Sequence, residues 1–327
     1  TGEELTYDLD DTELAARSNY GFRSVRILPG NIGYIRVDHF PDPRQGFDTA
    51  TGAMQFTENT DALIFDLRYN RGGYNEMIQL LVSYLYSGDD PVKLDHFSMN
   101  ADGQAIERSH WVQASLPGKR TPDRPVYVLT SSVTFSAGEW MARILSELGR
   151  ATIIGQQTVG AAHSVTLKRV NSQFVMQVPI GLTTGPVTRT DFEGVGVEPH
   201  IEVPSHAALT TARKLALKAI DPGKTETDIA WDLHEMQAPA WPTDEMMRDR
   251  ADIIGTYDGR EIFVENGQLI YRWLNRYSLA LTPIGGGLFA VQGEQDYRFR
   301  IVRENGKVSG VRRELRDGNS SFHGRSE

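Results

Sequence analysis

The sequence predicts an α/β fold built on a parallel sheet, followed by a small antiparallel β domain. Three short apolar runs without polar alternation, residues 62–67, 126–129 and 151–154, are typical of strands buried on both faces of a parallel sheet. Amphipathic helical patterns follow the first two runs at about 74–86 and 137–148. This order predicts right-handed crossovers that place helices on the faces of the sheet.

The antiparallel domain is indicated by a change of pattern near Ile253. Short alternating runs follow, interrupted by the turn pairs Asn266-Gly267 and Asn305-Gly306, which favour hairpins in a small sheet or barrel. We therefore expect an N-terminal arm at 1–17, a core at 18–220, a linker at 221–250, the β domain at 251–318 and a flexible tail at 319–327.

Composition argues against several classes of protein. The 327 residues are 39% hydrophobic and 24% charged, which is ordinary for globular domains. The net charge of -9, with no basic stripe, argues against a nucleic-acid partner. The sequence contains no run of 18 apolar residues, which is the length that would suggest a membrane span. The absence of cysteine excludes disulfides and a cysteine nucleophile and fits an exported, periplasmic or extracellular protein, although the acidic first residues show no signal peptide.

Ser136 stands at the junction between a predicted strand and a predicted helix. That junction lies at the carboxyl end of the parallel sheet, where open α/β folds place their sites. Most serines before helices are N-caps, so a structural role competes with a catalytic one. The Gly72-Gly73 turn precedes a helix in the same way, and its N–H groups, together with that of Ala137, would suit an oxyanion. A Gly-Gly turn is, however, more often only a tight connection.

A serine nucleophile needs a base to accept its proton. His163 on the next loop and His39 after an early strand are the candidates, although a single loop histidine is usually a surface residue. Glu193 could orient such a histidine, whereas an acid in a Gly-rich loop is usually only solvated. No histidine pair with metal-site helical spacing, phosphate loop or Gly-x-Ser-x-Gly elbow is present, so we expect no metal or cofactor.

Four ordered motifs resemble those of the C-terminal-processing (tail-specific) serine peptidases, over roughly residues 18–220. They are residues 66–73 (DLRYNRGG), 130–139 (TSSVTFSAGE), 155–160 (GQQTVG) and 193–199 (EGVGVEP). The nearer branch contains the interphotoreceptor retinoid-binding protein repeats and the tricorn protease core. The resemblance implies a crotonase/ClpP-like ββα core and serine peptidase chemistry.

The resemblance also implies roles for individual residues. Ser136 matches the nucleophile, Gly73 and Ala137 match the oxyanion-hole donors, and Glu193 matches the catalytic glutamate of the tricorn core. Where the processing peptidases keep a lysine base this chain has Ala161, so we predict His163, two residues later, as the base.

Two functions follow from these observations. The first is a serine peptidase that cleaves extended polypeptide segments. The alternative is a non-catalytic module that binds peptides or small hydrophobic ligands on the same scaffold. Retention of Ser136 and Glu193 favours the peptidase, and the missing lysine favours the binding module.

Overall fold

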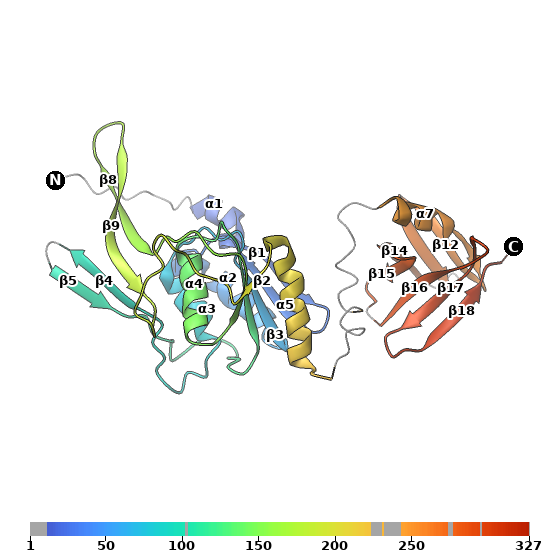
Figure 1. The fold of residues 1–327 in the computed structure, drawn as a ribbon, viewed down its shortest axis with the longest axis horizontal. Coiled ribbons are helices and arrows are strands. Elements are labelled where there is room, and N and C mark those ends of the chain that lie inside the picture. The colour runs from blue at the N-terminus through green and yellow to red at the C-terminus, as the bar shows by residue number, and fades with distance from the viewer. Residues whose placement is uncertain are drawn as a thin grey trace. The chain divides into compact units, whose positions relative to one another are not determined.

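The computed structural model describes residues 12–101, 104–223, 231, 243–273, 277–294 and 296–326. The chain divides into two compact units, Thr1–Pro222 and Gly223–Glu327 (Figure 1). Of the predicted arm, residues 1–11 lie outside the described part, and Thr12–Arg17 form the short helix α1. Most of the predicted linker also lies outside the described residues. No helix in the described part is both long and apolar enough to cross a membrane.

A six-stranded sheet forms the centre of the first unit, in the order β1-β2-β3-β6-β7-β10. An antiparallel hairpin of residues 22–37 forms one edge, and the remaining neighbours are parallel. The strands are β1 (Phe22–Leu28), β2 (Ile32–Val37), β3 (Ala62–Asp66), β6 (Val126–Thr130), β7 (Thr152–Gly155) and β10 (Ile201–Glu202).

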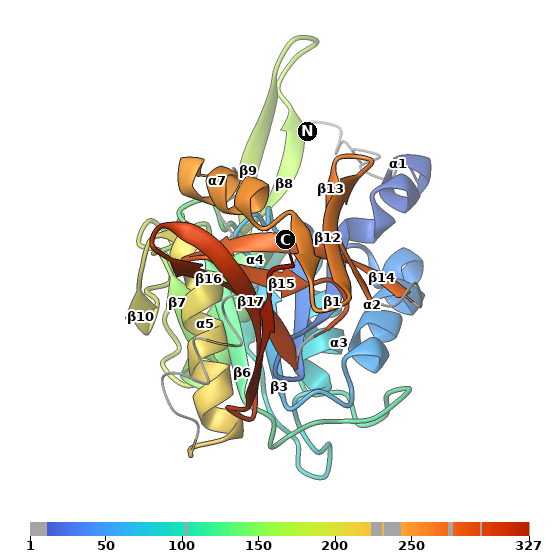
Figure 2. The same ribbon diagram turned by 90° about the vertical axis from the view of Figure 1, so that its right-hand side faces the viewer.

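Helices cover both faces of this sheet (Figures 1 and 2). The first face carries α2 (Pro43–Phe56), α3 (Asn75–Ser83) and α4 (Ala137–Glu147), and the other carries α5 (Ser205–Ile220), which contacts β3, β6 and β7. All five residues of β3 are therefore buried, which explains why the strand is an unbroken apolar run ending in Asp66. A single 3-10 turn, Asn19–Gly21, leads into β1.

A second, four-stranded antiparallel sheet lies outside this core. It has the order β5-β4-β9-β8 and joins two strands that precede β6 in the chain to two strands that follow β7. The β8–β9 hairpin projects away from the helices (Figure 1). Strand β8, which begins at His163, forms one edge of this sheet. The strands are β4 (His96–Ala101), β5 (Gln104–Arg108), β8 (His163–Arg169) and β9 (Val175–Thr184).

The second unit is a nearly closed antiparallel barrel. Eight strands of the described residues follow one another in chain order, and an isolated bridge connects Tyr257 of the first strand with Arg325, the residue after the last strand. Apolar side chains such as Phe289 and Phe299, both fully buried, fill its core. The elements are α7 (Asp244–Asp252), β11 (Gly255–Tyr257), β12 (Arg260–Glu265), β13 (Gln268–Trp273), β14 (Tyr277–Gly285), β15 (Leu288–Val291), β16 (Tyr297–Glu304), β17 (Lys307–Leu315) and β18 (Ser320–Gly324).

The prediction of a flexible tail at 319–327 is wrong for residues 320–324. These residues form β18, which pairs with β17 and brings the chain to the closing bridge. Backbone hydrogen bonds, which need no apolar side chains, make this pairing, so the polar sequence gave little strand signal. The Phe322 ring lies across Gly310, where a Cβ atom would come within 2.4 Å of it.

Candidate functional site

Three loops meet at the carboxyl edge of the parallel sheet, following β3, β6 and β7. The Phe135 N–H donates to the carbonyl of Asn70 at 3.0 Å, which joins the first loop to the second. The Val159 N–H donates to the carbonyl of Thr134 at 3.3 Å, which joins the second to the third. Residues 192–197 complete the edge, because the Thr158 N–H reaches the carbonyl of Val197 at 3.3 Å. The structure thus brings together the four motif segments.

Asn70 holds the first loop in shape and is fully buried. Its side-chain N–H donates to the carbonyl of Val37 at 3.0 Å, and its Oδ1 accepts from the Gly72 N–H at 2.8 Å. A Cβ atom added to Gly138 would come within 2.6 Å of the same oxygen. One amide therefore fixes the Gly72 turn relative to β2 and lies against the start of α4.

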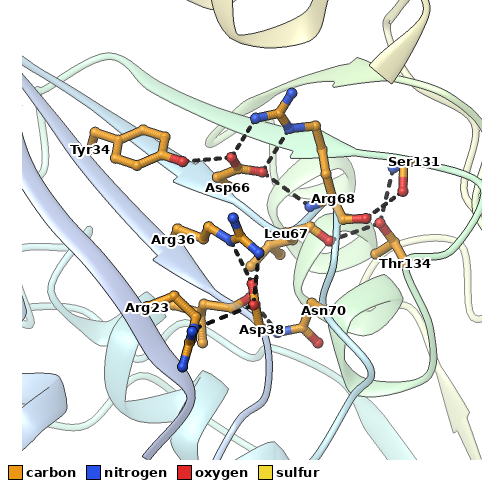
Figure 3. Close-up of polar contacts among 11 residues, drawn as sticks. Arg23, Tyr34, Arg36, Asp38, Asp66, Leu67, Arg68, Asn70, Ser131 and Thr134 are labelled. Atoms are coloured by element: carbon orange, nitrogen blue, oxygen red, sulfur yellow. Dashed lines mark hydrogen bonds and ion pairs between the residues drawn. The ribbon is translucent and has the colours of Figure 1, made fainter. Parts of the chain in front are cut away.

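Hydroxyl groups bind the second loop to the first. Thr134 Oγ1 donates to the carbonyl of Leu67 at 2.9 Å, and the Ser131 hydroxyl donates to the carbonyl of Arg68 (Figure 3). Both carbonyls follow β3, and that of Leu67 also accepts from the Asn70 N–H at 3.0 Å. Both hydroxyls belong to the motif at residues 130–139. The polar run after an apolar strand was the only signal for them.

Asp66, the last residue of β3, holds the start of the first loop through its carboxylate. Its carboxylate accepts a hydrogen bond from the Tyr34 hydroxyl at 2.7 Å and two from the Arg68 side chain at 2.7 and 2.9 Å (Figure 3). Arg68 continues to the carbonyl of Ser205 at the start of α5, at 2.6 Å. Burial favours a higher pKa for Asp66, but the hydrogen bonds and charge of Arg68, together with Tyr34, lower this pKa below its ordinary value.

Ser136 has a strained backbone at the start of α4. Its φ of 52° and ψ of -120° lie outside the regions that L-residues favour, a conformation that costs about 1–3 kcal/mol. The neighbouring Gly72 makes room for it, because a Cβ atom there would stand 2.9 Å from the Ser136 Cβ. The sharp strand-to-helix turn of a nucleophile elbow is therefore present without the Gly-x-Ser-x-Gly pattern.

The two predicted oxyanion donors flank this turn. Ala137 is the first residue of α4, where helix N–H groups have no intrahelical acceptor. Gly73 has a φ of 132° and lies against Phe40, whose carbonyl would be 2.0 Å from a Cβ atom. Within the described residues, neither backbone N–H has an acceptor. Both N–H groups are thus available to a ligand. The two donors are also close in space, because a Cβ atom added to Gly72, the neighbour of Gly73, would stand 3.3 Å from the Ala137 nitrogen.

Glu193 and His163 lie together at the start of β8. One Glu193 oxygen accepts from the N–H groups of Ala162 and His163 at 2.7 and 3.1 Å. The same oxygen lies 3.7 Å from the Nδ1 of His163. About a third of the His163 side chain and two fifths of the Glu193 side chain are exposed, so both can meet a ligand from solvent.

His39 lies two residues after the end of β2. Its side chain forms a hydrogen bond with the backbone of Gly72, the residue in contact with Ser136. Desolvation lowers the pKa of His39 below its ordinary value, although the hydrogen bond to Gly72 acts in the other direction. A histidine that bonds through one nitrogen keeps the other for proton transfer.

Two cavities in the described part of the chain have neither Gly72 nor Ser136 in their walls. A cavity of about 700 Å³ belongs to the barrel unit, between α7 and the ends of β13 to β15, and holds none of the predicted catalytic residues. A smaller one of about 400 Å³ has His163 in its wall, beside Met99 and Leu182. Within the described residues, no group of three or more histidines, aspartates and glutamates could hold a metal ion.

Known proteins resemble the first unit. The carboxy-terminal-processing protease of Bartonella bacilliformis is 28% identical over 181 residues, which cover 54% of this chain and 39% of that protein. The carboxyl-terminal-processing protease of Synechocystis sp. is 30% identical over 138 residues, covering 40% of this chain and 29% of that protein. The chain therefore spans about two fifths or less of the length of these relatives.

A solved structure and a family model agree with these relatives. The putative S41 protease from Bacteroides fragilis has a TM-score of 0.52 and 20% identity, covering 63% of this chain and 59% of that chain, which supports the fold. Residues 31–203, more than half of the chain, match the model described as peptidase family S41. The resemblance found in the four motifs is confirmed, and the chain belongs to peptidase family S41.

Proposed function

We propose that this protein is a serine peptidase that cleaves polypeptides in extended conformation, with Ser136 as its nucleophile. The observation that carries the proposal is the strained Ser136 turn packed against Gly72, with the unpaired N–H groups of Gly73 and Ala137 on either side of the contact. A strained residue at a strand-to-helix junction lowers the stability of the fold, so its presence points to a functional role. Here the strained turn places a hydroxyl beside two N–H donors, which is the arrangement that acyl transfer requires.

The reaction proceeds through an acyl-enzyme. Ser136 Oγ attacks the peptide carbonyl carbon while a base accepts the hydroxyl proton, and the negative oxygen binds the N–H groups of Gly73 and Ala137. The protonated base then gives its proton to the leaving amine as the C–N bond breaks. The same base next activates a water molecule, which hydrolyses the ester and restores Ser136.

His163 is our first candidate for the base, with Glu193 as the group that orients it. The 3.7 Å separation of the two side chains and the anchoring of the Glu193 carboxylate on two backbone N–H groups support this pairing. His39 is the second candidate, because its bond to Gly72 brings it to the nucleophile turn. The relatives' lysine position is Ala161 here, which supports a histidine-dependent branch close to the tricorn core.

The substrate is proposed to lie beside β8. This strand begins at His163 and forms an edge of its sheet, so it offers unpaired backbone groups to an extended peptide. The relatives' names refer to processing at carboxyl termini, and we propose substrates cut near that end for this chain as well. The parallel β2–β3–β6–β7 core with its crossover helices supports a crotonase/ClpP-like architecture. The lack of cysteine supports action outside the cytoplasm.

Labelling with a fluorophosphonate probe tests the assignment. We expect the wild type to form a covalent adduct on Ser136 and to cleave an unstructured polypeptide, and we expect Ser136→Ala to do neither. Adducts are located by peptide mass spectrometry. A wild type that neither labels at Ser136 nor cleaves would leave the alternative of a non-catalytic binding module, which gains no support from the relatives found.

A further inference from the structure

Glu139 is a fully buried acid on α4, one turn after Ser136. Its Oε2 accepts from the N–H of Ser136 at 2.7 Å and from the N–H of Ala161 at 3.0 Å. Its Oε1 accepts from Thr158 Oγ1 and from the Gly160 N–H, both at 2.6 Å. Four hydrogen bonds and the positive end of α4 stabilise the buried charge.

Helix capping accounts for only one of these four bonds. An acid at the third position of a helix commonly accepts from the backbone N–H of the cap residue, here Ser136. The other three bonds go to Thr158, Gly160 and Ala161, which are 19 to 22 residues away on the loop after β7. Glu139 therefore joins the strained turn at Ser136 to the loop of residues 158–161.

That loop also carries the rest of the candidate site. The hydroxyl of Thr158 accepts from the Val197 N–H at 2.7 Å, and the carbonyl of Gly160 accepts from the Gly194 N–H at 2.9 Å. Both partners belong to the segment that bears Glu193. The Glu193 carboxylate in turn holds the N–H groups of the two residues that follow Ala161. One continuous chain of hydrogen bonds thus runs from Ser136 through Glu139 to Glu193.

We propose that Glu139 is a positioning residue for catalysis: it holds Ser136 in its strained backbone conformation and sets the loop at 158–161, and with it His163 and Glu193, relative to the nucleophile. This inference rests on the proposed peptidase function. Because Glu139 is fully buried, it acts through the residues that it holds and not by contact with substrate. Nucleophile and base must be aligned within fractions of an ångström, so loss of this carboxylate is expected to slow acylation strongly.

Glu139→Gln is the test, and Glu147→Gln is its matched control. The glutamine keeps the volume but replaces one acceptor oxygen by an N–H₂ donor, which faces two of the four donors. Glu147 lies two turns later on the same helix and accepts similarly from the N–H groups of Val187 and Thr188, with no contact to Ser136. We expect fluorophosphonate labelling of Ser136 to slow about 100-fold in the first variant and to stay close to wild type in the second.

Amide hydrogen exchange in a Ser136→Ala background supplies a readout that does not depend on activity. Glu139→Gln should accelerate exchange at Gly160 and Ala161, whereas Glu147→Gln should accelerate it only at Val187 and Thr188. Should Glu139→Gln fail to fold, Thr158→Val removes one bond to the same carboxylate, together with the bond from the Val197 N–H, and Thr158→Ser restores both. The first is then expected to label slowly and the second at nearly the wild-type rate.

The outcomes separate the two proposals. Unchanged exchange at Gly160 and Ala161 in Glu139→Gln overturns the inference, whatever the activity. Wild-type labelling rates in Glu139→Gln, or equal slowing in both glutamine variants, overturn it as well. A wild type that does not label defeats the peptidase proposal and, with it, any catalytic role of Glu139. Slow labelling with fast loop exchange, confined to Glu139→Gln, supports the inference.

Discussion

One oxygen of Glu193 lies 3.7 Å from the Nδ1 of His163 and 3.1 Å from the backbone nitrogen of the same residue. The carboxylate therefore holds the backbone of His163 and lies beside its imidazole ring. It also accepts from the Ala162 N–H at 2.7 Å, so its own position is well defined despite its exposure. This arrangement resembles the base-and-orienter pair of a serine triad, in which the acid stabilises the protonated imidazole.

Glu193→Gln should lower kcat with little change in KM. The amide oxygen can still accept from the N–H groups of Ala162 and His163, so the loop keeps its shape while the charge beside the imidazole is lost. We expect a loss on the order of 10²-fold or more in kcat, because the acid no longer stabilises the imidazolium. Glu198→Gln, an exposed acid of the same segment, is the control and should retain full activity. Equal kinetics for the two variants would argue against an orienting role.

Replacing each histidine separately identifies the base. His163→Ala should lower kcat/KM by about 10²–10⁴-fold, and His39→Ala should leave most of the activity. A base works only when deprotonated, so kcat/KM falls as the pH drops through its pKa. Because desolvation lowers the pKa of His39, a profile governed by that residue would keep activity below pH 6.5, its ordinary value. A larger loss in His39→Ala, with such an acid-extended profile, would transfer the role to His39.

The sequence predicted the parts of the fold that local patterns determine. Strands β3, β6 and β7 follow from unbroken apolar runs, and the junction at Ser136 follows from the change to helical spacing. Local patterns do not reveal which polar groups meet across the fold. Thr134 bonds a carbonyl 67 residues away, and Glu139 bonds a loop about 20 residues away, and nothing in either motif identifies those partners. The polar strand β18 was missed for a related reason, since its partner β17 determines its conformation.

Gly72→Ala should abolish labelling of Ser136. The new Cβ atom would come within 2.9 Å of the Ser136 Cβ, and the φ of +94° is strained for any L-residue with a side chain. Gly52→Ala provides the contrast, because Gly52 lies on the exposed side of α2 with no atom within 4 Å of an added Cβ. That change should stabilise the protein by about 0.5–1 kcal/mol in urea unfolding. Normal labelling in Gly72→Ala would show that the two residues are not held in contact.

Asp66→Asn should destabilise the first unit at neutral pH by about 3–5 kcal/mol, because it leaves the mostly buried Arg68 guanidinium without its carboxylate partner. The pKa of Asp66 is lowered in the folded protein, so its contribution to stability is present above the unfolded-state pKa, about 3.9. That contribution is lost as the pH falls through the lower folded-state pKa. Urea unfolding at a series of pH values should therefore show the two proteins converging in acid. Asp61→Asn, at an exposed acid before β3, should differ little from wild type at every pH.

Phe289→Ala tests whether the barrel is energetically separate from the peptidase unit. Phe289 is fully buried in the barrel core, and truncating such a ring costs about 3–5 kcal/mol. Because the two units have separate cores, calorimetry should show one transition shifted to lower temperature and the other unchanged. Ser136 labelling at a temperature below both transitions should keep its wild-type rate. Phe322→Ala, which removes a half-exposed ring from β18, should shift the barrel transition much less. A single transition that moves as a whole, together with slower labelling in Phe289→Ala, would mean that the barrel supports the catalytic edge.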